Sequence, residues 1–229
     1  SFGDPEDIFA AKKESTYSVN MTGNANFGWR WYDDHRIETT SIFLRNTDDK
    51  ASITDSHTSS FPLSDGQGFR QYKTRFEERN LSVNQIRGFH RFGGITRDLI
   101  GFDKFEWLDE LTFDWFYSDA TSRTDIPNQT NILFKTVVDS TSAEVSAQNL
   151  QASSSAADFR FTDLNDDVES YGYDVKLPLM TSFGDVTLTG GYRYSQKTRS
   201  YEQLQFGLGT DDTSVAQSAI GTVSEIFSD

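Results

Sequence analysis

The sequence predicts an all-β protein of long antiparallel up-and-down hairpins, arranged as part of a transmembrane-type β-barrel. Aromatic residues make up 14% of the 229 residues, and apolar residues at helical spacing are scarce. Several stretches alternate apolar and polar residues over far more than the roughly five to six residues of an ordinary strand. Because successive side chains of a strand point to opposite faces, such stretches predict ribbons with one apolar and one polar face. An isolated piece of such a wall is expected to collapse to an open sheet or a sandwich.

The first predicted strand, residues 14–32, carries the longest alternation. At about 3.3 Å per residue, the alternating part is roughly 45–50 Å long. When tilted by about 45°, a ribbon of this length crosses a hydrocarbon core about 30 Å thick. Its apolar side comprises Tyr17, Val19, Met21, Gly23, Ala25, Phe27, Trp29 and Trp31.

A polar turn at residues 33–35 leads into a return strand at 36–47. The alternation of this second strand changes parity at Ile42 and Leu44, which predicts a β-bulge. Extended, aromatic-rich patterns recur farther along the chain. Four further long strands are predicted at 69–92, 108–123, 170–180 and 186–206, which makes six in all.

The predicted connections alternate between short and long. Short turns lie at 33–35 and 181–184, and a moderate connection with room for a short helix lies at 93–106. Membrane barrels have this arrangement, with short turns on the periplasmic side and long loops outside. Aromatic residues near strand ends, such as Tyr17 and Trp31, suit two interfacial girdles. The long external loops are predicted at 48–68, 124–157 and 207–229, the last with helical spacing near 215–226.

The composition excludes several classes of protein. A net charge of −14 and a pI near 4.6 argue against nucleic acid as a partner, because phosphates favour a basic surface. The absence of cysteine excludes disulfides, thiolate catalysis and cysteine-based zinc sites. No run of 18 apolar residues occurs, so no transmembrane helix is predicted. A mean hydropathy of −0.58 does not argue against a barrel, because alternation averages away in a hydropathy window.

The start of the chain, from Ser1 to Pro5, lacks the basic and apolar regions of a signal peptide. We therefore expect either that a signal has been removed or that the sequence is an internal piece of a longer protein.

The sequence predicts no catalytic residues, no cofactor and no metal site, and thus no enzyme. His35, His57 and His90 share no spacing, and we interpret them as incidental histidines. The sequence signatures of zinc proteases, serine hydrolases and phosphate-binding loops are all missing.

Two acidic stretches are candidate sites. The stretch from Asp163 to Asp167 resembles the start of a calcium-binding loop, but Val168 stands where that loop requires glycine, and the distal glutamate is missing. Adjacent carboxylates such as Glu77 and Glu78 point to opposite faces of a strand, which is poor geometry for glycoside hydrolysis. The acids are therefore interpreted as solubilising charges.

Several segments resemble the barrel of the TonB-dependent receptors, which are outer-membrane transporters of Gram-negative bacteria. The strongest likeness is a hairpin made by residues 169–179 and 183–194, in which aromatic alternation is combined with glycines and a short turn. Residues 18–49, 76–90 and 113–127 also resemble barrel segments of this family. Each piece is degenerate, so the order and spacing of the pieces carry the resemblance.

The resemblance implies active uptake of a scarce nutrient, such as an iron–siderophore complex, a cobalamin or a glycan. It implies outer-membrane lipid as a partner, a small-molecule or oligosaccharide ligand at the external loops, and the TonB system as the energy source. Family members carry an N-terminal plug domain and an energy-coupling segment before a barrel of about 22 strands. Neither is visible in this chain, so residues 1–229 are expected to be an internal barrel segment that lacks the TonB-contacting region.

Two other classes of protein remain open. One is a secreted, soluble β-sandwich that binds carbohydrate through exposed tryptophans and tyrosines, and a requirement for detergent would separate it from a membrane protein. The other is a glycosidase-like β enzyme whose acids are paired by the fold, which an activity screen on glycans would test.

Overall fold

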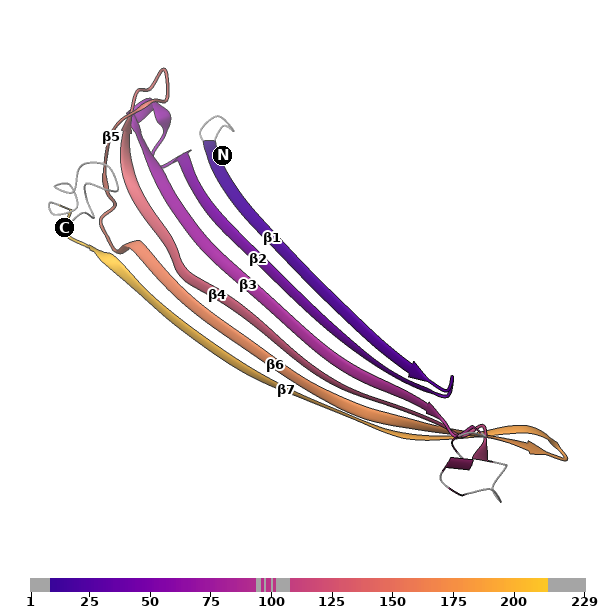
Figure 1. Cartoon of the computed structure of the whole chain (residues 1–229). Helices are drawn as coiled ribbons and strands as arrows, with labels where there is room; N and C mark the ends of the chain where they lie inside the picture. Colours follow the sequence, from indigo (N-terminus) through magenta and orange to yellow (C-terminus); the bar gives the residue numbers. More distant parts are fainter. Residues whose placement is uncertain (1–8, 94–95, 97, 100, 102–107, 214–229) are drawn as a thin grey trace.

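In a computed structural model, the chain forms one long antiparallel sheet whose strands bow together along their length (Figure 1). The structure describes residues 9–93, 96, 98–99, 101 and 108–213. Neighbours in the sheet follow the order β1-β2-β3-β4-β6-β7, and the short β5 pairs with β4 off this path. The strands are β1 (Phe9–Trp31), β2 (His35–His57), β3 (Gln67–Arg91), β4 (Thr112–Val138), β5 (Val145–Leu150), β6 (Ser153–Thr181) and β7 (Gly184–Thr210), with a 3-10 turn η2 at Leu63–Asp65.

The predicted fold class is confirmed in the form of a single open sheet. The six long strands have 23 to 29 residues each, several times the usual length. All pairings are antiparallel between strands joined by up-and-down connections. No helix among the described residues has the length and apolar character needed to span a membrane.

The predicted long loops are shorter than expected, because much of their sequence is strand. Residues 48–57 belong to β2, so the connection predicted at 48–68 shrinks to the few residues before β3. Most of 124–157 belongs to β4, β5 and β6, and β7 extends to Thr210. Residues 48–57 have few apolar side chains, and the apolar residues of 124–157 gather around Phe134 instead of alternating, so neither segment shows the strand pattern although both pair in the ladder.

Side-chain contacts reinforce that ladder in the polar segments. Arg70 in β3 donates from Nε to Oδ1 of Asp55 in β2 at 2.6 Å. Asp55 lies in the stretch 48–68 that the sequence predicts as a loop. The turn between β4 and β5 is built on Asp139, whose Oδ1 accepts the backbone N–H groups of Thr141 and Ser142 at 2.9 and 2.8 Å. These hydrogen bonds, led by that of Ser142, hold the pKa of the Asp139 carboxyl below its ordinary value.

Both predicted short turns are confirmed. The first lies between β1 and β2, where Tyr32 and Asp33 have φ angles of 50° and 52°. Its third residue, Asp34, is buried and accepts a hydrogen bond from Arg91 Nε at 2.8 Å, so the turn is tied to the end of β3. The second turn lies between Thr181 and Gly184. The helices expected near 93–106 and 215–226 fall largely or wholly outside the described residues.

The predicted bulge in the second strand is wrong. The pairing of β2 with β1 and β3 is unbroken, so Ile42 and Leu44 simply lie on the polar face, opposite Val83 and Leu81. The sheet bulges instead in β4 around Pro127, where the registers with β3 and with β6 both shift. Proline has no N–H for the ladder, so within a central strand it is confined to such irregularities.

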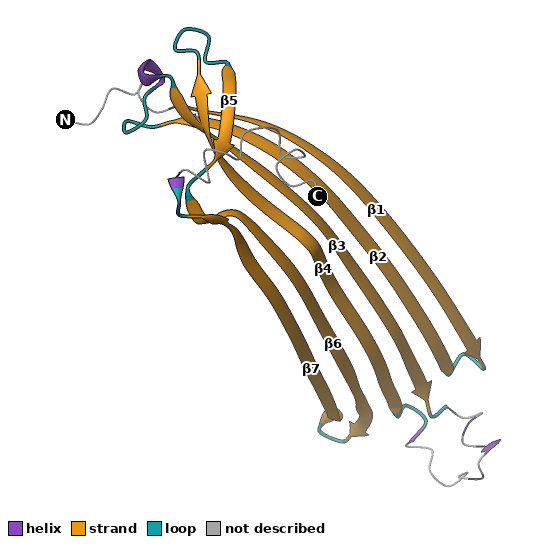
Figure 2. Cartoon of the chain, turned by 90° about the vertical axis from the view of Figure 1, so that its left-hand side faces the viewer, coloured by secondary structure: helices purple, strands orange, loops and turns teal. Residues whose placement is uncertain are grey.

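Close packing in the described part of the chain is limited to one small cluster at the long-loop end, where β5 folds beside β4 (Figure 2). Phe134 is its fully buried centre and meets the ring of Tyr72 edge-on at 5.5 Å. Elsewhere the sheet is one layer thick. The cluster comprises Ile132, Phe134, Leu150, Ala156 and Ala157, with Tyr72 and Phe159 packed against it.

Candidate functional site

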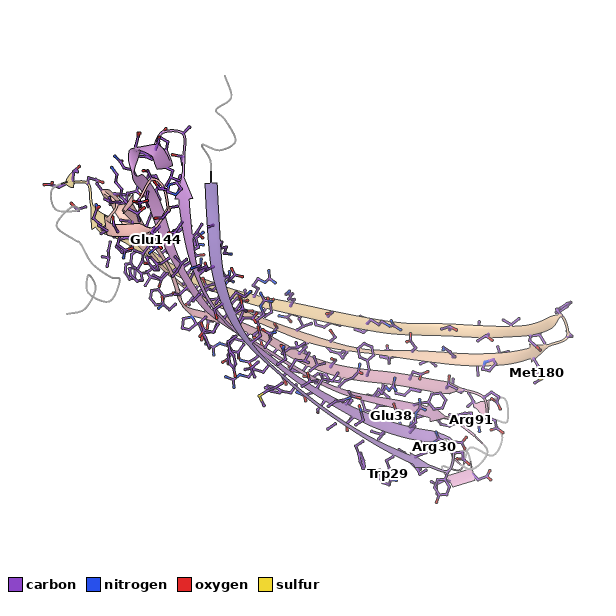
Figure 3. The ribbon with its side chains drawn as sticks, turned by 90° about the horizontal axis from the view of Figure 1, so that it is seen from above. Trp29, Arg30, Glu38, Arg91, Glu144 and Met180 are labelled. Carbon is purple, nitrogen blue, oxygen red and sulfur yellow. The ribbon has the colours of Figure 1, made fainter. Side chains whose placement is uncertain are left out.

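The two faces of the sheet differ in chemistry. On β1, Trp29 lies on the apolar face and its neighbour Arg30 on the polar face (Figure 3). Directly opposite residues of an antiparallel pair share a face, so the register carries this division across all the strands. Beside the short turns, the apolar face presents an apolar band made of Phe27, Trp29, Ile37, Ile86, Phe113, Trp115, Tyr117, Tyr171, Tyr173, Leu188, Tyr192 and Tyr194.

The apolar band is continuous across strands because its rings touch. Phe113 on β4 lies 6.0 Å from Tyr173 on β6, and Tyr173 lies 6.4 Å from Tyr192 on β7. Toward the long-loop end the same face becomes polar, since Arg45 pairs with Glu78 at 2.5 Å and Arg123 pairs with Asp163 at 2.6 Å. β1 keeps the predicted apolar face along most of its length, and β7 presents Leu204, Phe206 and Leu208 on this face near its end.

Two histidines meet at the turn end of the apolar band. Trp115 Nε1 donates to His90 Nε2 at 3.0 Å, and an indole nitrogen can only donate. His90 therefore carries its proton on Nδ1 and donates it to Nδ1 of His35 at 3.1 Å. His35 in turn donates from Nε2 to Thr96 Oγ1 at 2.8 Å, and its ring stacks on Trp31 at 5.1 Å. This chain of donors requires both histidines to be neutral.

The histidine pair is not arranged as a metal site. A metal bound by both Nδ1 atoms would move the His90 proton to Nε2, where it would face the N–H of Trp115. Sequence spacing gave no sign of this pair, because it depends on the register between β2 and β3. His57 lies apart from it, buried, with Nδ1 3.0 Å from the carbonyl oxygen of Gln67.

On the polar face, cations and acids pair across neighbouring strands. Glu38, near the short turns, is one of these acids (Figure 3). Glu38 on β2 accepts from Arg87 Nε on β3 at 2.6 Å. On β6 and β7, Arg193 pairs with Asp174 at 2.9 Å, and Arg199 pairs with Asp166 at 2.6 Å. These exposed pairs neutralise local charge and add little stability.

Nearer the long-loop end, the polar face is hollowed into a cavity of about 360 Å³, here called the basic pocket. The register places Lys50, Arg75, Gln129 and Arg160 in one row across β2, β3, β4 and β6. The walls contain five cationic and two acidic side chains: Lys12, Lys50, Lys73, Arg75 and Arg160, with Glu14 and Asp158. The pocket could not be predicted from spacing along the chain, because its residues come from five strands.

The candidate calcium stretch from Asp163 to Asp167 is part of β6 rather than a loop. Asp163 and Asp166 therefore lie on opposite faces and pair with Arg123 and Arg199. Among the residues that the structure describes, no group of three or more His, Cys, Asp and Glu side chains is placed to hold a metal ion.

Comparison with known proteins adds no identification. No protein-family model matches the sequence, and no curated protein matches it.

Proposed function

We propose that this chain forms part of the β-barrel wall of a TonB-dependent receptor in the outer membrane of a Gram-negative bacterium. The observation that carries the proposal is a one-layer sheet exposed on both faces. The accessible surface is 15,378 Å², whereas a compact monomer of 25.9 kDa exposes about 10,500 Å². An aromatic surface of this extent is stable only when something apolar covers it.

Each face has a role in this proposal. The apolar band contacts hydrocarbon, and its tyrosines and tryptophans lie at the height where interfacial girdles form. The polar face lines a water-filled lumen. Toward the long-loop end, the same face carries ion-paired side chains such as Arg45 and Arg123. This polar region extends beyond the hydrocarbon at the external end.

The edges of the sheet fit a larger barrel. In the described part of the chain, β1 pairs only with β2, and β7 pairs only with β6 along its length. Such long unpaired edges attract other strands. In a receptor barrel of about 22 strands, further strands of the parent protein would continue the ladder at both edges.

The function that follows is active import of a scarce nutrient, such as an iron–siderophore complex, a cobalamin or a glycan. The long-loop end would face the outside and admit the ligand, and polar groups of the lumen would select it. Energy would come from the TonB system through a region outside this chain. The alternative of a soluble sandwich requires two packed sheets, whereas the described strands form one.

The requirement for detergent tests this proposal. The chain is expected to give a monodisperse, strand-rich species in a neutral detergent and to aggregate after detergent is removed, because nothing else covers the apolar band. Size-exclusion chromatography with circular dichroism makes the comparison. A monodisperse, strand-rich monomer in detergent-free buffer would refute the membrane assignment.

A further inference from the structure

The basic pocket departs from the overall charge of the protein. The chain carries a net charge of −14, yet five cations and two acids meet in this one cavity of the polar face. One acid, Glu14, is paired with Lys12. The other, Asp158, accepts a hydrogen bond from Gln205 Nε2 at 2.9 Å. Arg75 is paired with the buried carboxylate of Glu77 at 2.6 Å, and the pocket still holds more cations than acids.

Three cations of the pocket lack an acidic partner. Lys50, Lys73 and Arg160 form no ion pair within 4 Å with another residue in the described ranges, whereas Arg87, Arg193 and Arg199 on the same face each have one. Lys50 also lies directly opposite Arg75 in the register. Like charges at directly opposite positions destabilise a sheet, so this row favours the arrival of negative charge.

Buried polar atoms in the pocket also need partners. Arg75 Nε, Asn131 Oδ1 and Arg160 Nε are all shielded and have no hydrogen-bond partner among the described residues. All three residues line the basic pocket. A buried donor without a partner is unfavourable, and more so when it is charged, so water or a ligand in the cavity would satisfy these atoms. The two guanidinium N–H groups call for an acceptor such as a carboxylate or phosphate oxygen.

The spacing of the cations indicates a ligand with more than one anionic group. Arg75 and Arg160 lie on β3 and β6, with β4 between them, and strands in a sheet are about 4.8 Å apart. Their backbones are thus about 10 Å apart, and the cavity volume of about 360 Å³ is in the range of small-molecule sites.

We propose that the basic pocket binds a small multivalent oxyanion, whose carboxylate or phosphate groups bridge Arg75 and Arg160 and are neutralised by Lys50 and Lys73. The amide of Asn131 contacts the same ligand, as acceptor from a hydroxyl or, after rotation, as donor. The proposal rests on the proposed function in one respect, since the polar face must be open to water. If the chain is a transporter wall, the oxyanion is either the transported cargo or an anion that accompanies the cargo, and it binds at the external end of the lumen.

Isothermal titration of the detergent-solubilised full chain with citrate and with pyrophosphate tests the proposal, with maltose as the neutral control. We expect saturable binding of at least one anion and none of maltose. Arg160→Gln and Lys50→Gln should each weaken binding by about tenfold, which is about 1.4 kcal/mol, because each removes a charge that contacts the anion. Lys176→Gln, which removes a charge from the turn end of the same face, should leave binding unchanged. Circular dichroism verifies that each variant is folded.

A third titration distinguishes a free anion from a lipid headgroup. Short-chain phosphatidic acid and pyrophosphate are each added to micelles in which citrate is bound. If the natural ligand is a lipid phosphate, phosphatidic acid should displace citrate more strongly than pyrophosphate does. If the natural ligand is a free anion, phosphatidic acid should displace citrate more weakly. Absence of saturable anion binding, or equal weakening by Lys176→Gln, would overturn the proposal. A chain that needs detergent but binds neither anion would leave the membrane assignment standing, so the two failures are distinguishable.

Discussion

Replacing Phe134 by alanine is expected to lower the free energy of unfolding by about 3–5 kcal/mol, the largest loss from any single side chain in this account. Phe134 is completely buried and packs edge-on against Tyr72. It is also the centre of the one cluster of close packing in the described part of the chain. Truncation would leave a cavity between β4 and β5 that a thin sheet has few other contacts to offset. Urea unfolding in detergent micelles, followed by circular dichroism, measures the loss.

Val137→Ala provides the matched control. Val137 lies three positions along the same strand but is 51% exposed, so its truncation should cost less than about 1 kcal/mol. Equal losses for the two variants would show that the cluster does not hold the long-loop end together.

Leu188→Arg should destabilise the membrane-inserted state by about 2–4 kcal/mol, the cost of an arginine on the lipid side of a membrane barrel. Leu188 belongs to the apolar band, opposite Leu177, and its side chain is 56% exposed in the isolated sheet. In the proposed barrel this exposed surface is covered by hydrocarbon, where a guanidinium is strongly disfavoured. The equilibrium between the urea-unfolded chain and the chain folded into lipid vesicles measures the effect.

The adjacent substitution Thr189→Arg separates a lipid effect from a general effect of charge. Thr189 lies on the polar face, opposite Lys176, so the new arginine would stand in water. Its cost should be within about 1 kcal/mol of zero. If the two arginines were equally costly, the face of Leu188 would not be the lipid-facing one.

Much of the fold could be predicted from the sequence, because alternation reports directly on strands with two different faces. The stretch from Tyr17 to Trp31 covers about two thirds of β1, and the tight turns lie where the sequence predicts them. Alternation fails where both faces are polar. Residues 48–57 are predicted as loop for this reason, and residues 124–157 because their apolar residues occur in runs such as 132–134 that do not alternate, although backbone pairing holds most of both segments in strands.

The sites could not be predicted, because they depend on register rather than on spacing along the chain. His35 and His90 are neighbours only because β2 and β3 pair in one particular alignment. Lys50, Arg75 and Arg160 form a row for the same reason, and the bulge at Pro127 makes Gln129 the β4 member of that row. Hydrophobic pattern fixes which face a residue takes, but not its neighbour on the next strand.

Side-chain environment along β4 tests the central claim, that one face meets hydrocarbon and the other meets water. The chain has no cysteine, so single cysteines at positions 113 to 118 can each carry a nitroxide in lipid vesicles. We expect oxygen, which partitions into hydrocarbon, to relax the labels at 113, 115 and 117. A water-soluble nickel complex should relax those at 114, 116 and 118, including the position of the aromatic Phe116. Loss of this period of two, or its reversal, would contradict the account.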